Sequence, residues 1–121
     1  MEATPPPKRS PMNASIALQR LNGSHTMLAA LAGFFLEDAP QQFEQLREAV
    51  RSASLPQVAR TAHGLRGLSA TFEAIPVMQL TQEIERLAKN GEASGLHELV
   101  ETLAGELARL TEVLRQVGAQ K

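Results

Sequence analysis

The chain has 121 residues, a formal net charge of −1 and a hydrophobic content of 43%, which suit one folded domain with its own core. It contains no cysteine, so disulfides, thiolate metal sites and thiol nucleophiles are excluded. The near-neutral charge and the lack of Trp and Tyr argue against nucleic-acid binding. No apolar run reaches the roughly 20 residues of a membrane span, so we expect a cytoplasmic domain without membrane contact of its own.

The chain begins with a segment rich in proline and polar side chains. Residues 1–12 hold four of the seven prolines and predict a disordered tail or linker. The folded domain is expected over residues 13–118. It should open with a short helix that Asn13 or Ser15 caps and that Asn22-Gly23 ends.

Two amphipathic segments follow, one on each side of Pro40. Ser24 is expected to cap the first, whose apolar positions recur at helical spacing: Met27, Leu28, Leu31, Phe34 and Phe35. Pro40 either begins a new helix at its first turn or kinks a continuous one. Beyond Pro40 the pattern resumes at Phe43, Leu46, Ala49 and Val50. It stops at residues 52–54.

Three further helices are predicted. Ser54 is a candidate N-cap, with Pro56 tolerated in the first turn, for a helix from Leu55 to about Phe72. Apolar or small residues recur along it three and four apart: Leu55, Val58, Ala62, Leu65, Ser69 and Phe72.

Pro76 marks the start of the next helix, which Asn90-Gly91 ends, and Ser94 opens a leucine-rich last helix. Because short connections between long amphipathic helices make neighbours antiparallel, we expect an all-α protein. Its architecture should be an antiparallel up-down four-helix bundle with a short N-terminal helix and no β-strand.

The most unusual segment is Ala62-His63-Gly64-Leu65-Arg66-Gly67, where a histidine stands between two glycines inside a helix. Each such glycine costs roughly 1 kcal/mol relative to alanine. At about 100° per residue, His63 faces away from the apolar seam. Its neighbours on that surface are small: Gly67, Ala70 and Ala74, with Gly64 further round. We interpret this surface as one that a partner approaches closely.

The chemistry available at His63 is that of an exposed imidazole between two arginines. A neutral imidazole is nucleophilic at a ring nitrogen, and Arg60 and Arg66 suit phosphate oxygens. No carboxylate lies three or four residues from His63 in the sequence, and no second histidine lies within a turn, so we predict neither a hydrolytic triad nor a metal site. His25 and His97 are interpreted as surface residues. The alternative is that the small residues serve tight helix packing and that His63 is an ordinary surface residue.

Read as Ala62-His63-x-Leu65-Arg66-Gly67-x-Ser69-x-x-Phe72-x-Ala74, the segment resembles the signature of histidine-containing phosphotransfer (HPt) domains. The resemblance extends over about residues 16–115 and includes Leu46-Arg47-Glu48-Ala49 and Ile84-Glu85. This chain has Arg66 where the family has lysine, and Glu73 where it usually has glycine.

The resemblance implies a role for several residues. His63 would be the phosphoacceptor, Arg66 would steady the phosphoryl group, and Gly67 would let a response-regulator receiver domain dock. The expected docking surface comprises Arg60, Gly64, Gly67, Ala70, Thr71 and Ala74. Glu73 adds a negative charge near the helix end and is expected to alter the turn there.

The function implied is that of a phosphorelay intermediate, which takes a phosphoryl group from one receiver aspartate and passes it to another. Such a domain is no enzyme and has no kinase activity, and it needs no cofactor, since the divalent metal ion belongs to the receiver. We expect a monomer, either free-standing or part of a hybrid sensor kinase. The alternative function is a helical docking or oligomerisation module without phosphorylation. A dimerising histidine-kinase core is disfavoured because Gly64, not an acidic residue, follows His63.

Overall fold

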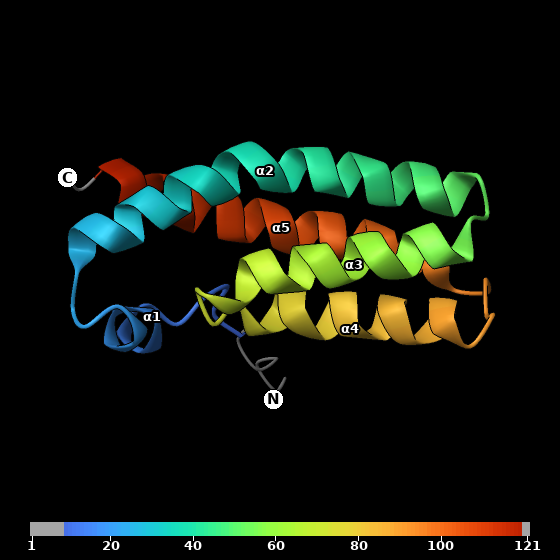
Figure 1. Cartoon of the computed structure of the whole chain (residues 1–121), viewed down its shortest axis with the longest axis horizontal. Helices are drawn as coiled ribbons and strands as arrows, with labels where there is room; N and C mark the ends of the chain where they lie inside the picture. Colours follow the sequence, from blue (N-terminus) through green and yellow to red (C-terminus); the bar gives the residue numbers. More distant parts are fainter. Residues whose placement is uncertain (1–8, 120–121) are drawn as a thin grey trace, which may run out of the picture.

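The computed structural model describes residues 9–119, which form five α-helices and no strand (Figure 1). The helices are α1 (Ala14–Arg20), α2 (His25–Arg51), α3 (Leu55–Ala70), α4 (Ile75–Lys89) and α5 (Leu96–Ala119). The four long helices lie alongside one another, and α1 sits at the end of the bundle where α2 begins (Figure 1). The predicted all-α four-helix bundle with a short N-terminal helix is confirmed. None of the described helices is long and apolar enough to cross a lipid bilayer.

The predicted tail, residues 1–12, lies partly outside the described residues, which begin at residue 9. At its end the chain already packs on the bundle, so the prediction of a disordered segment is wrong for Met12. The Met12 side chain is buried in the core, and the N–H of Asn13 donates to the Phe72 carbonyl at 3.0 Å. Burial of one large apolar side chain anchors this stretch, which its proline content did not predict.

Helix ends follow the capping residues for the first two helices. Asn13 Oδ1 accepts the N–H of Ile16, and Ser24 Oγ accepts the N–H of Met27, both at 3.1 Å. Ser54 occupies the N-cap position of α3, but its side chain makes no capping hydrogen bond.

The structure decides the alternative left open at Pro40 and corrects the predicted start of the last helix. The helix α2 runs through Pro40 without interruption. The helix α5 begins at Leu96 and not at Ser94, because Gly95 has φ = 86° and this left-handed conformation separates Ser94 from the helix.

The core lies between the inner faces of α2 to α5. Phe35 of α2 meets Phe72, just beyond α3, edge to face with ring centroids 5.8 Å apart. Two of the apolar positions predicted from the α2 pattern are not in the core, since Met27 is 51% and Phe34 is 61% exposed. Each precedes a buried neighbour, Leu28 or Phe35, by one residue and is therefore rotated by about 100° from it.

Candidate functional site

His63 lies in the middle of α3 on the face that points away from the core, and its side chain is 63% exposed. The opposite face of α3 is buried and consists of Val58, Thr61, Ala62, Leu65 and Ser69. The helical spacing therefore places His63 where the sequence predicted, with its imidazole open to a partner.

A carboxylate from the neighbouring helix lies beside His63. Glu85 of α4 is 8% exposed, and its Oε2 and Oε1 lie 3.3 and 3.4 Å from His63 Nδ1. Glu85 lies 22 positions after His63 in the sequence, far outside one helical turn, so the spacing around His63 did not predict this carboxylate. The signal available in the sequence was an acidic residue directly beside Ile84, on the apolar side of an amphipathic helix.

Two cations share this carboxylate with His63. Lys89 Nζ lies 2.9 Å from Glu85 Oε2, and Arg66 Nη2 lies 3.9 Å from Glu85 Oε1. Burial raises the pKa of Glu85, but hydrogen bonds and charges from Lys89 and His63 outweigh burial and hold this pKa below its ordinary value of 4.5. Glu85 is therefore an ionised carboxylate at neutral pH.

The Nδ1 atom of His63 has two neighbours that favour opposite forms of the ring. When Nδ1 carries the proton it donates to Glu85, and when it carries the lone pair it accepts from Arg66 Nη2, which is 3.2 Å away. The first form leaves the lone pair on Nε2. Within residues 9–119, Nε2 has no hydrogen-bond partner, so in this form it carries the free lone pair of an exposed ring and is a nucleophile.

The two glycines that flank His63 differ in their surroundings. A Cβ atom at Gly67 would meet no atom within 4 Å, whereas a Cβ atom at Gly64 would lie 2.7 Å from Gln42 Oε1 of α2. Gly67 therefore belongs to the open surface beside His63. Gly64 belongs to the contact between α2 and α3.

The remaining predicted docking residues divide into accessible and buried positions. Arg60 is exposed, and Ala70 and Thr71 are partly exposed. The prediction that Ala74 lies on this surface is wrong, because Ala74 is 0% exposed. The helix α3 ends at Ala70, so helical spacing no longer applies at position 74.

The turn after α3 is set by Glu73, which has φ = 49°. A left-handed residue other than glycine is strained by roughly 1–2 kcal/mol. Arg20 of α1 holds this turn: its Nη2 contacts Glu73 Oε2 at 2.8 Å, and its Nη1 donates to the Ala70 carbonyl at 2.7 Å. Glu73 therefore has a backbone conformation that glycine adopts more readily, and Arg20 of α1 supports the turn.

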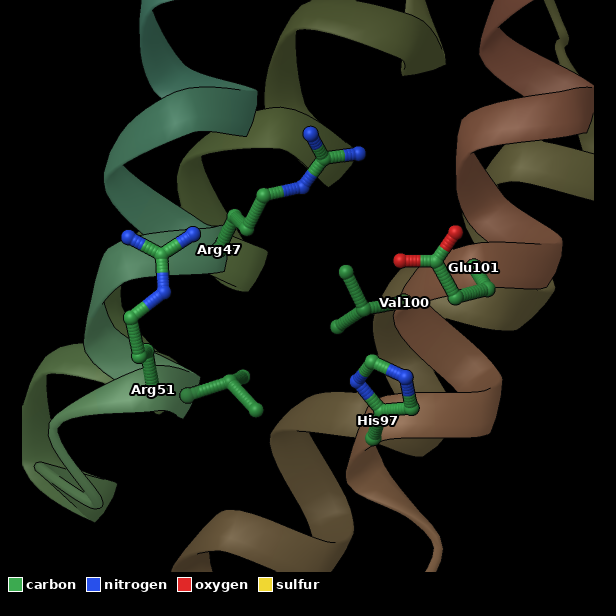
Figure 2. A pocket seen from close by; sticks show the side chains of 6 residues that line it. Arg47, Arg51, His97, Val100 and Glu101 are labelled. Carbon is green, nitrogen blue, oxygen red and sulfur yellow. The ribbon is translucent and has the colours of Figure 1, made fainter.

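Other polar features lie away from His63. A cleft of about 550 Å³ separates Arg47 and Arg51 of α2 from His97 and Glu101 of α5 (Figure 2). Each arginine is paired with a glutamate three residues earlier in α2, at 3.6 and 2.7 Å, so its charge is already offset. Across residues 9–119 there is no group of three or more side chains that could hold a metal ion.

Comparison with known proteins connects this site to a family. The model of the Hpt domain matches residues 30–117, which include His63, Arg66 and Glu85. The crystal structure of the HPT domain from the Hpt sensor hybrid histidine kinase from Shewanella superposes with a TM-score of 0.81, covers 93% of this chain and 97% of that chain, and is 22% identical. That likeness shows the fold. A comparison with curated proteins gives no match. The chain therefore belongs to the Hpt domain family and has a phosphotransfer role in two-component signalling.

Proposed function

We propose that the domain is a phosphorelay intermediate in which His63 accepts a phosphoryl group from an aspartate of one receiver domain and passes it to an aspartate of another. The observation that carries the proposal is the exposed imidazole of His63, with the ionised Glu85 at its Nδ1 and the open surface of Gly67 beside it. Family membership supports the same reaction class.

The transfer we propose uses Nε2 as the nucleophile. Its lone pair forms the N–P bond while the bond between phosphorus and the aspartyl oxygen breaks, and the aspartate carboxylate leaves with that electron pair. Nδ1 keeps its proton, so the ring becomes positively charged, and Glu85 offsets this charge by accepting the Nδ1–H hydrogen bond. Attack by a second receiver carboxylate reverses these steps.

Arg66 is proposed to stabilise the phosphoryl group. It lies one turn after His63 on α3, and its Nη2 already reaches the imidazole. The planar guanidinium has several N–H donors that match phosphoryl oxygens. We expect the divalent ion required for the transfer to be held by the receiver.

The docking surface that we propose extends from α3 onto α2. On α3 it comprises Arg60, Gly67, Ala70 and Thr71, with the partly exposed Gly64 at its border with α2. Gln42 adjoins Gly64, and Phe34 lies two turns before Gln42, about 12 Å along α2 and within a quarter turn around its axis. Met27 lies two turns further. Exposed apolar side chains next to polar ones are typical of protein interfaces, so Phe34 and Met27 are included as contacts for the receiver.

A labelling experiment tests the function. Incubation with a phosphorylated receiver should place an acid-labile, base-stable phosphate on the wild-type chain and on His97→Gln, whose substituted histidine is exposed on α5. His63→Gln should take no label. Equal labelling of His63→Gln would refute the proposal, and receiver binding without any label would favour a docking module instead. We further propose that the domain acts as a monomer in the cytoplasm, which light scattering and cell fractionation would check.

A further inference from the structure

Glu85 is the point at which the positively charged groups of the site meet. Its two oxygens lie 2.9 Å from Lys89 Nζ, 3.9 Å from Arg66 Nη2 and 3.3 Å from His63 Nδ1. The groups come from α3 and α4, so the carboxylate also links these two helices.

A buried carboxylate needs partners, and Glu85 has more positive charge around it than a single carboxylate requires. Lys89 is mostly exposed and lies one turn after Glu85 on α4. Its ammonium group is a compact charge on a flexible stem, so it can turn to another anion without moving the helix. Because Lys89 Nζ and His63 Nδ1 both contact Glu85 Oε2, the two nitrogens are roughly 6 Å apart or less.

We propose that Glu85 holds Lys89 and Arg66 in the resting site, in place of a phosphoryl group, and that both cations turn to the phosphoryl oxygens once His63 is phosphorylated. Lys89 is then a second residue that stabilises the phosphoryl group, together with Arg66. This inference rests on the proposed function for the identity of the modified residue.

The charges of the site explain why the exchange is favourable. Phosphorylation at Nε2 with Nδ1 still protonated makes the imidazole ring positive, so the ring itself becomes the counter-ion of Glu85. The phosphoryl group brings a charge of about −2, which attracts both cations more strongly than a carboxylate that is already paired. Glu85 therefore keeps a partner throughout, and no buried charge is left alone.

Chemical phosphorylation tests this without any receiver. A chain with His25→Gln and His97→Gln keeps His63 as its only histidine, and potassium phosphoramidate then modifies that residue alone. The second pKa of the phosphoryl group, followed by ³¹P NMR, should rise by roughly 0.2–0.7 unit in Lys89→Gln, the size expected when an exposed ion pair is lost. The matched control is Arg86→Gln, because Arg86 also lies on α4 but pairs with Glu83 through Nε at 2.9 Å. It should leave this pKa unchanged.

A double-mutant cycle decides whether Lys89 leaves Glu85. If it does, Lys89→Gln shifts the phosphoryl pKa by a similar amount in the wild-type and Glu85→Gln backgrounds. A shift that appears only in the Glu85→Gln background would show that Lys89 stays with the carboxylate and would overturn the inference, as would equal shifts in Lys89→Gln and Arg86→Gln.

The results of chemical phosphorylation do not depend on whether a receiver transfers a phosphoryl group to His63. A chain that shows the Lys89 dependence but takes no label from a receiver contradicts the proposed function and leaves the inference intact. A chain that takes the label on His63 but whose phosphoryl pKa does not depend on Lys89 supports the proposed function and contradicts the inference.

Discussion

Gly67 offers a sharp test of the idea that the surface beside His63 is cleared for a partner. A Cβ atom at this position would meet no atom within 4 Å, and the residue is exposed in the last turn of α3, within the helix. Alanine should therefore fit without strain. Because glycine in a helix interior is less favourable than alanine by about 1 kcal/mol, Gly67→Ala should stabilise the free domain. For a domain of this size that gain raises the melting temperature by roughly 4 °C.

A large side chain at position 67 should weaken docking of the receiver, although alanine there stabilises the free domain. Gly67→Arg places a long side chain on the surface next to the imidazole and should keep the fold, because nothing in the domain occupies that space. Phosphotransfer from a receiver should fall at least tenfold, which corresponds to about 1.4 kcal/mol of lost interaction. Thermal unfolding by circular dichroism and the rate of ³²P transfer measure the two effects separately.

Gly105 provides the matched control. It is an exposed glycine of α5 that also has no atom within 4 Å of a Cβ position. Gly105→Ala should raise the melting temperature as Gly67→Ala does, and Gly105→Arg should leave transfer unchanged. Wild-type transfer by Gly67→Arg would refute the reasoning about close approach, and a lower melting temperature for Gly67→Ala would show that the position is not open.

Three further outcomes follow from the geometry. Because folding lowers the pKa of Glu85 from 4.5, the ionised carboxylate stabilises the folded state at pH values above 4.5. The difference in unfolding free energy between wild type and Glu85→Gln should therefore shrink as the pH falls below 4.5. Urea titrations at pH 7 and pH 3 that gave the same difference would contradict this. Glu73→Gly relieves roughly 1–2 kcal/mol of left-handed strain but loses the exposed Arg20 pair, worth up to about 1 kcal/mol, so its unfolding free energy should equal that of wild type or exceed it by about 1 kcal/mol. A clear loss of stability would mean that Arg20 matters more than the strain. Phe34→Ser should weaken receiver binding several-fold with little change in stability, whereas Phe35→Ala should lower the unfolding free energy by roughly 3–5 kcal/mol. Calorimetry measures both effects, and a large loss of stability in Phe34→Ser with little loss in Phe35→Ala would contradict the prediction.

The helices, and the capped starts of the first two, could be predicted from local patterns. Ser24 caps α2 as predicted, and Asn13, one of two candidates, caps α1; both are local effects, because a capping hydrogen bond joins residues three apart. The outward position of His63 also followed from the sequence, since the periodicity of α3 alone fixes which side faces the core.

Positions at the edge of an apolar face were less certain. Met27 and Phe34 fit the helical pattern of α2 as well as Leu28 and Phe35 do, yet they are exposed. Periodicity locates the centre of an apolar face, but the width that is buried depends on how closely the neighbouring helices pack. Ala74 failed for a different reason, because the left-handed Glu73 changes the direction of the chain before it.

By itself the sequence determined an all-α bundle and an exposed histidine with small neighbours, because both depend on interactions within a few residues along one helix. Tertiary structure decided what surrounds that histidine. Glu85, Lys89 and Gln42 come to the site from α4 and α2, and only the packing of these helices against α3 brings them within reach. The carboxylate at Nδ1 is therefore a property of the fold, although the nucleophile beside it is visible in the sequence.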